Sequence, residues 1–519
     1  MITRNSILKK TAQVGGYTLL SRILGIIRET TLSRYLGPTA AFDVFLTAFK
    51  LPNSLRRLFA EGALSAALVP SLVKHMKYEN KESISGVMGV SFLFFEGIVA
   101  LICMLVMLFP AYTFHLMAPG FSQELVVMGA PLLRVLMPFI LFLSCSAIMG
   151  AALHAVSHFF VPAIAPIILN IVFITGAGVC LYYNLDVIWL CGFIVAGSAL
   201  QLLIHSLAYF KEGFALRMVT KKDIKEFGAV GIKFLLCLPT VSIMEINLFI
   251  DMTFASYLPA GDMSLLYLAN RFANIPIGVF AVAFATILLP HFSRVATLTP
   301  KRLPFYVTET IKLIAWAMIP TAFLMVFFSE DIFHTLFLSE KFTPAHVWHA
   351  AKILSFFMVG LFSFSLNKIL VNVYYALHVT WVPSAIAAIA TGINVLFNWM
   401  FLVRFGACGI ALATALSAVF QTILLLGILA IKYGVACSGR SIFKFFIYYA
   451  AQLGAAYALF GALYYACYYA ILHWLPPLVS ALFIDTIIFW MWVGPLVLLL
   501  FWFLWATRKK AKVHVYFLS

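Results

Sequence analysis

Long apolar segments recur along the whole chain, and they limit its fold more than any other feature. Each is about 20 residues or longer, the length at which an α-helix crosses the hydrocarbon core of a bilayer. Hydrophobic residues make up 63% of the 519 residues and charged residues only 10%, whereas soluble domains have about 45–50% and about 25%. The sequence therefore predicts an all-α polytopic membrane protein and excludes a soluble enzyme.

Fourteen such segments are predicted to be transmembrane helices. An even number of spans returns both termini to the same side of the membrane. The predicted spans cover residues 11–34, 42–70, 86–110, 128–153, 160–182, 187–209, 228–254, 263–290, 306–328, 350–375, 382–402, 407–431, 442–470 and 480–506.

Basic residues are distributed unequally between the two sets of connections. The termini and the even-numbered connections contain 21 Lys and Arg residues, and the other connections contain three, Arg34, Lys341 and Arg404. Because cytoplasmic loops carry an excess of Lys and Arg, both termini are expected in the cytoplasm. This distribution accounts for most of the net charge of +16, so no nucleic-acid partner is expected.

A second group of charged residues lies inside the predicted spans. A charge at the centre of a membrane helix costs roughly 2.5–3.5 kcal/mol on the insertion scale, so these side chains are expected to line a protein or water-filled interior. The alternative is that they form interhelical ion pairs or extend to the membrane surface. The bases are Arg22, Arg28, Lys50, Arg56, Arg57 and Arg271, and the acids are Glu29, Asp43, Glu61 and Asp251.

The first span has one polar face. At about 100° per residue, Ser21, Arg22, Gly25, Arg28 and Glu29 fall within an arc of about 120°, and the isoleucines and leucine between them occupy the remainder. This stripe predicts that one side of the helix faces a polar cavity.

The chain also contains an internal repeat. Ala152-Leu153-His154 recurs as Ala376-Leu377-His378, and Asn170 recurs as Asn394, both at an offset of 224 residues. Transporters are often built from two such halves around a central site. The repeat predicts two pseudo-repeated six-helix lobes, residues 1–220 and 221–435, followed by an appended helix pair with a C-terminal tail, residues 436–519.

Enzymatic motifs are absent from the sequence. It contains no Gly-Lys dipeptide and hence no P-loop, and no dinucleotide fingerprint. The eight cysteines contain no C-x-x-C pair, which indicates neither a disulfide framework nor a metal framework. The chain is therefore expected not to be an enzyme and to need no cofactor, and its energy would come from an ion gradient, a voltage or the substrate.

Three motifs carry a resemblance to a known family. They are the run from Ser21 to Glu29, the run from Ala48 to Ser65 followed by Val69-Pro70, and the run from Ala269 to Pro276 followed by Leu289-Pro290. They resemble the lipid II flippases of the MurJ (MviN) family, within the multidrug/oligosaccharidyl-lipid/polysaccharide (MOP) exporter superfamily. The resemblance implies alternating-access export of lipid II, the undecaprenyl-linked peptidoglycan precursor, across a bacterial inner membrane for cell-wall biogenesis. It leaves open an association with the cell-wall synthesis machinery.

The resemblance also implies which residues act. The substrate site would consist of Arg22, Arg28, Glu29, Asp43, Arg56 and Arg271. A sodium site known in some members would correspond to Asp251, Asn394, Asn398, Ile410 and Thr414. Asn398 stands where that site can have Asp, so sodium binding is expected to be weak, and the alternative is that Asp251 pairs with Arg271.

Arginine forks bind phosphate oxygens bidentately, so the surplus of base favours an anionic lipid headgroup over a cationic drug. The alternatives are a flippase for another polyprenyl-linked glycan, a multidrug exporter of the same superfamily, and a scaffold for cell-wall enzymes. The last two spans are rich in aromatic residues, and the resemblance implies that they form a groove for the polyprenyl tail. Packing against membrane lipids is the alternative interpretation of these aromatic residues.

Overall fold

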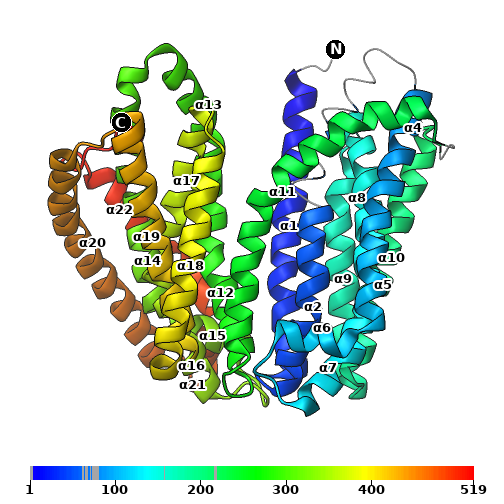
Figure 1. Cartoon of the computed structure of the whole chain (residues 1–519). Helices are drawn as coiled ribbons and strands as arrows, with labels where there is room; N and C mark the ends of the chain where they lie inside the picture. Colours follow the sequence, from blue (N-terminus) through cyan, green and yellow to red (C-terminus); the bar gives the residue numbers. More distant parts are fainter. Residues whose placement is uncertain are drawn as a thin grey trace. The chain divides into compact units, whose positions relative to one another are not determined.

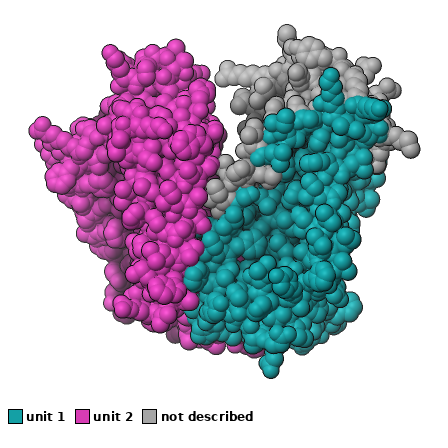
Figure 2. All heavy atoms as spheres, viewed as in Figure 1, with its two compact units in different colours: residues 1–264 teal, residues 265–519 magenta. Residues whose placement is uncertain are grey.

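The structure is a computed structural model that describes residues 4–60, 64, 68, 69, 72, 81–156, 158–215 and 219–518 (Figure 1). These residues form helices and connections, with no β-strand among them. The chain divides into two compact units, residues 1–264 and 265–519 (Figure 2). Each unit is described separately below.

The first unit contains ten α-helices and one π-helical segment in its described residues. In chain order these are α1 (Arg4–Leu36), α2 (Ala40–Phe59), α4 (Lys81–Ser91), η1 (Phe92–Glu96), α5 (Gly97–Leu108), α6 (Pro110–Met117), α7 (Gln123–Leu136), α8 (Pro138–Ala155), α9 (Phe160–Tyr183), α10 (Val187–Lys211) and α11 (Lys221–Ala255).

The second unit begins at Leu265, in the first turn of α12. Its elements are α12 (Asp262–Pro276), η2 (Ile277–Ala281), α13 (Val282–Leu298), η3 (Pro300–Arg302), α14 (Leu303–Phe327), α15 (Ser329–Phe337), α16 (Pro344–Met358), α17 (Leu361–Ala376), α18 (Trp381–Phe405), α19 (Ala407–Tyr433), α20 (Gly439–Trp474), α21 (Pro477–Asp485), α22 (Phe489–Thr507) and η4 (Tyr516–Leu518).

Ten helices within the described part of the chain are long and apolar enough to cross a membrane, and the bent pair α16 and α17 would make an eleventh. The other three predicted spans correspond to α1, α2 and α11. These three helices carry most of the predicted intramembrane charges, which lowers their apolar character. The chain is thus an all-helical, multi-pass membrane protein, and the helices are compatible with fourteen spans.

The compact units do not divide where the repeat does. The repeat places the boundary at 220/221, whereas packing places it at 264/265, because α11 packs against α2, α4 and α6 of the first unit. Aromatic contacts such as Phe95 with Phe234, 4.8 Å between ring centroids, join α11 to this unit. A repeat reflects sequence correspondence and a compact unit reflects contacts, so the repeat boundary stays a prediction.

The bend between α16 and α17 has a steric cause. The two helices meet at 44°, and Gly360 lies between them. A Cβ added at Gly360 would lie 2.7 Å from the Cα of Ala415 on α19. Only glycine allows the bent pair to approach α19 this closely.

The appended helices pack on α14. Tyr449 and Tyr457 of α20 donate hydrogen bonds to the carbonyls of Trp316 and Pro320, at 2.6 and 2.7 Å. Gln452 of α20 donates to the carbonyl of Leu504 on α22 at 2.7 Å. These buried polar contacts fix α20 between its two neighbours.

The C-terminal tail, residues 508–518, folds back onto the start of α14. The backbone N–H of Tyr516 donates to Oε2 of Glu309 at 2.9 Å, and Oε1 of Glu309 accepts from Lys312 at 2.7 Å. Tyr516 also packs edge-on against Phe305 and Tyr306. The connection before α20 reaches the same place, where the Ser438 N–H donates to Thr308 at 3.2 Å.

Candidate functional site

The polar stripe on α1 is largely buried within the first unit, and its lining of a polar cavity stays a prediction. Glu29 is 2% exposed and Gly25 is buried, whereas Ile23 and Ile27 are 48% and 45% exposed. Helix α1 packs against α9 of the same unit. The apolar face of α1 is therefore turned outward and most of its polar face inward.

Arg28 lies at the centre of this stripe, and its contacts include an ion pair, a hydrogen bond and a cation–π contact. Its Nη2 donates to Oε1 of Glu29 at 2.6 Å, and its Nη1 donates to Oδ1 of Asn170 on α9 at 3.2 Å. Its guanidinium carbon lies 5.1 Å from the ring centroid of Phe173. The amide of Asn170 in turn donates to the carbonyl of Ser21 at 3.3 Å. Glu29 and Arg28 thus form an ion pair within the stripe.

Asn170 was not among the predicted site residues. Its recurrence as Asn394 at the repeat offset was the available signal, but a repeated asparagine in a helix does not indicate its partner. Asn170 is 8% exposed, and its side chain bonds both Arg28 and the α1 backbone. It thereby fixes the plane of the guanidinium group, which matters because bidentate recognition depends on that plane.

Arg22 and Arg56 are more accessible. Arg22 is exposed, six residues before Arg28 on α1. Arg56 on α2 is partly buried, and its Nε donates to Oδ1 of Asn53 at 3.1 Å. Both side chains remain candidates for contact with an anionic ligand, while Glu61 lies outside the described residues.

Glu245 on α11 binds Arg57 and Ser54 of α2, and it was not among the residues predicted from the sequence. Its Oε1 accepts from Arg57 at 2.8 Å and its Oε2 accepts from Ser54 at 2.6 Å. Lys50 lies one turn before Ser54, with its Nζ 5.5 Å from the ring centroid of Phe249. An acid within the predicted span 228–254 was the available signal. The alternative interpretation, an interhelical ion pair, is therefore correct for Arg57.

Asp43 serves as a helix cap in this structure. Its Oδ2 accepts from the N–H of Gly261 at 2.6 Å and its Oδ1 from the N–H of Ser264 at 2.8 Å, in the first turn of α12. Gly261 has a φ of +93°, and a Cβ there would lie 2.4 Å from the carbonyl oxygen of Pro38. The carboxylate thus satisfies N–H groups that have no partner within α12. Contact between Asp43 and substrate stays a prediction.

Arg271 lies on α12 in the second unit, where it is exposed. Arg22, Arg28 and Arg56 belong to the first unit, and the structure describes each unit by itself. A shared site of these four arginines stays a prediction.

Four of the five predicted sodium ligands lie on adjacent helices. Asn394 and Asn398 are fully buried on α18, which packs extensively against α19. On α19 the Thr414 hydroxyl donates to the carbonyl of Ile410 at 2.9 Å. The fifth residue, Asp251, belongs to the first unit. Amide, hydroxyl and carbonyl oxygens are suitable donors for a hard cation, so the residues fit sodium chemically.

Apolar helices with polar side chains concentrated on α1, α2 and α11 define a polytopic helical transporter. Its fold is similar to that of a solved lipid II flippase MurJ in an inward closed conformation. That match has a TM-score of 0.77 and 23% identity, and it covers 97% of this chain and 100% of the other. It is also similar to an inward-facing MATE family multidrug resistance transporter of the MOP superfamily, with a TM-score of 0.67, 14% identity, and coverage of 80% and 94%.

Sequence comparison identifies the family. The family model for "Lipid II flippase MurJ" matches residues 32–484. A probable lipid II flippase MurJ of Haemophilus influenzae is 32% identical over 86% of this chain and 90% of its own length. One from Vibrio cholerae is 30% identical over 81% and 82%. The chain belongs to the lipid II flippase MurJ family.

Proposed function

We propose that this chain is a lipid II flippase of the bacterial inner membrane, with both termini in the cytoplasm. It moves the undecaprenyl-pyrophosphate-linked peptidoglycan precursor from the cytoplasmic to the periplasmic leaflet by alternating access, without chemical change to the substrate. Family membership supports this function, and the distribution of basic residues supports the orientation. Lipid II and the surrounding membrane lipids are its partners.

The geometry around Arg28 is the structural observation that carries the proposal. A guanidinium group held by Glu29 and Asn170 presents its fork in a fixed plane, and pyrophosphate oxygens match that fork. Glu29 offsets part of the charge and so lowers the cost of keeping Arg28 within the membrane. With Arg22, Arg56 and Arg271 exposed or partly buried, the predicted site remains cationic.

Sodium coupling is a second part of the proposal. The buried asparagines of α18 and the Thr414 and Ile410 oxygens of α19 support a cation site, which Asp251 would complete. Because Asn398 supplies an amide where a second carboxylate is possible, the site would bind a monovalent cation weakly.

Complementation tests the function directly. A bacterium whose own lipid II flippase is depleted should survive when this chain is expressed, and it should die when the chain carries Arg28→Ala at equal membrane abundance. Failure of the unmodified chain to support growth, although present in the membrane, would refute the proposal. If the chain instead rescues a strain that lacks its O-antigen flippase, the substrate would be another polyprenyl-linked glycan.

A further inference from the structure

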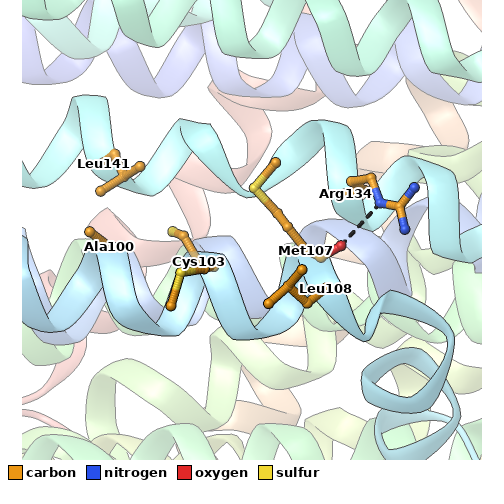
Figure 3. A pocket seen from close by; sticks show the side chains of 7 residues that line it. Ala100, Cys103, Met107, Leu108, Arg134 and Leu141 are labelled. Atoms are coloured by element: carbon orange, nitrogen blue, oxygen red, sulfur yellow. Dashed lines mark hydrogen bonds between the residues drawn. The ribbon is translucent and has the colours of Figure 1, made fainter.

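A groove of about 540 Å³ lies between α5 and the helices α7 and α8 of the first unit (Figure 3). Its lining is apolar except for one arginine. The apolar side chains that the argument uses are Ala100, Met104, Met107, Leu108 and Leu141, and the arginine is Arg134. Met104 and Leu108 are 52% and 61% exposed, so the groove opens on the outer surface of the unit, where a membrane protein meets lipid.

Arg134 is fixed at one end of this groove. Its Nε donates to the carbonyl of Met107 at 3.1 Å, and Figure 3 shows the guanidinium group turned away from the apolar lining. Met107 belongs to the last turn of α5, whose carbonyls have no partner within the helix. Nothing else in the described part of the chain is hydrogen-bonded to the side chain of Arg134. Its two NH₂ groups are therefore available to an external acceptor.

The depth of Arg134 in the membrane points to a lipid headgroup. By length and composition the apolar span Ser85–Leu108 ends beside Met107, and the end of a span is expected near the boundary between the hydrocarbon core and the headgroups. At that level Arg134 offers a polar contact, and the apolar groove beside it offers an apolar contact that continues into the hydrocarbon core. A phospholipid matches this arrangement, because its phosphate would meet Arg134 and its acyl chain would lie in the apolar groove.

We propose that this groove is a binding site for an anionic glycerophospholipid. One acyl chain lies along Ala100, Met104 and Leu141, and the phosphate accepts hydrogen bonds from Arg134. The cationic fork favours a headgroup with net negative charge over a zwitterionic one. With the termini in the cytoplasm, the lipid belongs to the periplasmic leaflet. This site is separate from the arginines of α1, and it does not depend on the transported substrate.

Native mass spectrometry of the full chain tests the site, with phosphatidylglycerol and phosphatidylcholine as probes. Arg134→Gln should weaken phosphatidylglycerol binding about tenfold, the loss expected for a charge-assisted hydrogen bond, and should weaken the binding of zwitterionic phosphatidylcholine less. Ala100→Phe should cause a similar loss by filling the groove with Arg134 intact. Arg404→Gln is the matched control, because Arg404 is also an exposed arginine in the last turn of a helix, and this variant should bind the lipid as the unmodified chain does.

A melting experiment provides a second measurement that does not depend on ion counting. Phosphatidylglycerol should raise the Tm of the unmodified chain by mass action and should raise that of Arg134→Gln less. Unchanged phosphatidylglycerol binding in both groove variants would overturn the proposal. Preferential binding of undecaprenyl phosphate over phosphatidylglycerol, lost in both variants, would overturn it in favour of the transported lipid.

Discussion

At the scale of single residues, Arg28 illustrates how a charged group can be stabilised inside a membrane protein and still be able to bind an anion. One NH₂ group pairs with Glu29, and the other contacts a neutral amide, Asn170. A second carboxylate in place of Asn170 would neutralise the guanidinium more fully and compete with a phosphate. The amide orients the group instead, which suits a site that must bind an anion and release it.

Transport should depend on both the charge and the orientation of Arg28. We expect Arg28→Ala and Arg271→Ala to abolish lipid II flipping in proteoliposomes, and Arg28→Lys to impair it because lysine lacks the bidentate fork. Asn170→Leu should retain the charge, lose the orientation, and reduce the rate about tenfold, the equivalent of one hydrogen bond to a charged group. The control, Arg404→Ala, should flip normally. Full activity of either alanine variant would remove that arginine from the site.

Sodium affinity should depend on residue 398. Asn398→Asp adds a second carboxylate to the proposed ligand set beside Asp251, so calorimetric titration with sodium should show tighter binding than the weak binding expected for the unmodified chain. Because Asn398 is fully buried, an unpaired carboxylate there is costly, and sodium should raise the Tm of the variant more than that of the unmodified chain. Absence of sodium binding in both proteins would eliminate the site.

At the scale of helices, Asp43 joins α2 to the start of α12 through two backbone N–H groups. Asp43→Asn leaves only one acceptor and places an N–H₂ group against a donor, so it should lower the free energy of unfolding by about 1–3 kcal/mol. Asp186→Asn is the control, because Asp186 caps α10 from an exposed position at 3.4 Å, and it should change stability by only tenths of a kcal/mol. Equal melting shifts in detergent would contradict this role of Asp43.

The tail and the connection before α20 meet at the start of α14, and Cys437 can report on this contact. Burial raises the pKa of the Cys437 thiol above its ordinary value of 9.0. The thiolate is the reactive form, so alkylation should be slow at neutral pH and accelerate only at higher pH than for an exposed thiol. Tyr516→Pro removes the N–H that donates a hydrogen bond to Glu309. The thiol should then become exposed, and alkylation should become fast at a lower pH than in the unmodified chain.

Mass spectrometry of the peptide that contains Cys437 measures this reaction. Tyr516→Ala serves as the control, because it loses the ring but keeps the N–H, and it should have the smaller effect. An identical pH profile in the proline variant and the unmodified chain would show that the tail does not protect this connection.

Helices were predictable from the sequence to a greater extent than their contacts. Among the described residues, apolar length alone located ten or eleven of the fourteen predicted spans, and the polar stripe of α1 gave its buried face. The pairing of Arg57 with Glu245 and of Arg28 with Asn170 depends on the register between helices far apart in the chain, which a single sequence does not encode locally. The division into compact units at 264/265 is likewise not readable from the sequence repeat, because it depends on which neighbours α11 packs against.

At the scale of the whole molecule, the direction of transport should depend on voltage. Each elementary charge that crosses the membrane field is worth about 2.3 kcal/mol per 100 mV, and an inside-negative potential favours outward movement of an anionic headgroup. The same field returns a cationic empty site toward the cytoplasm. In proteoliposomes with a potassium diffusion potential, flipping out of the negative compartment should exceed flipping at zero potential and should fall when the polarity is reversed. Because the arginines supply the moving positive charge, Arg22→Gln should reduce this voltage dependence in protein that still flips. Rates independent of both the size and the sign of the potential would exclude voltage as the driving force.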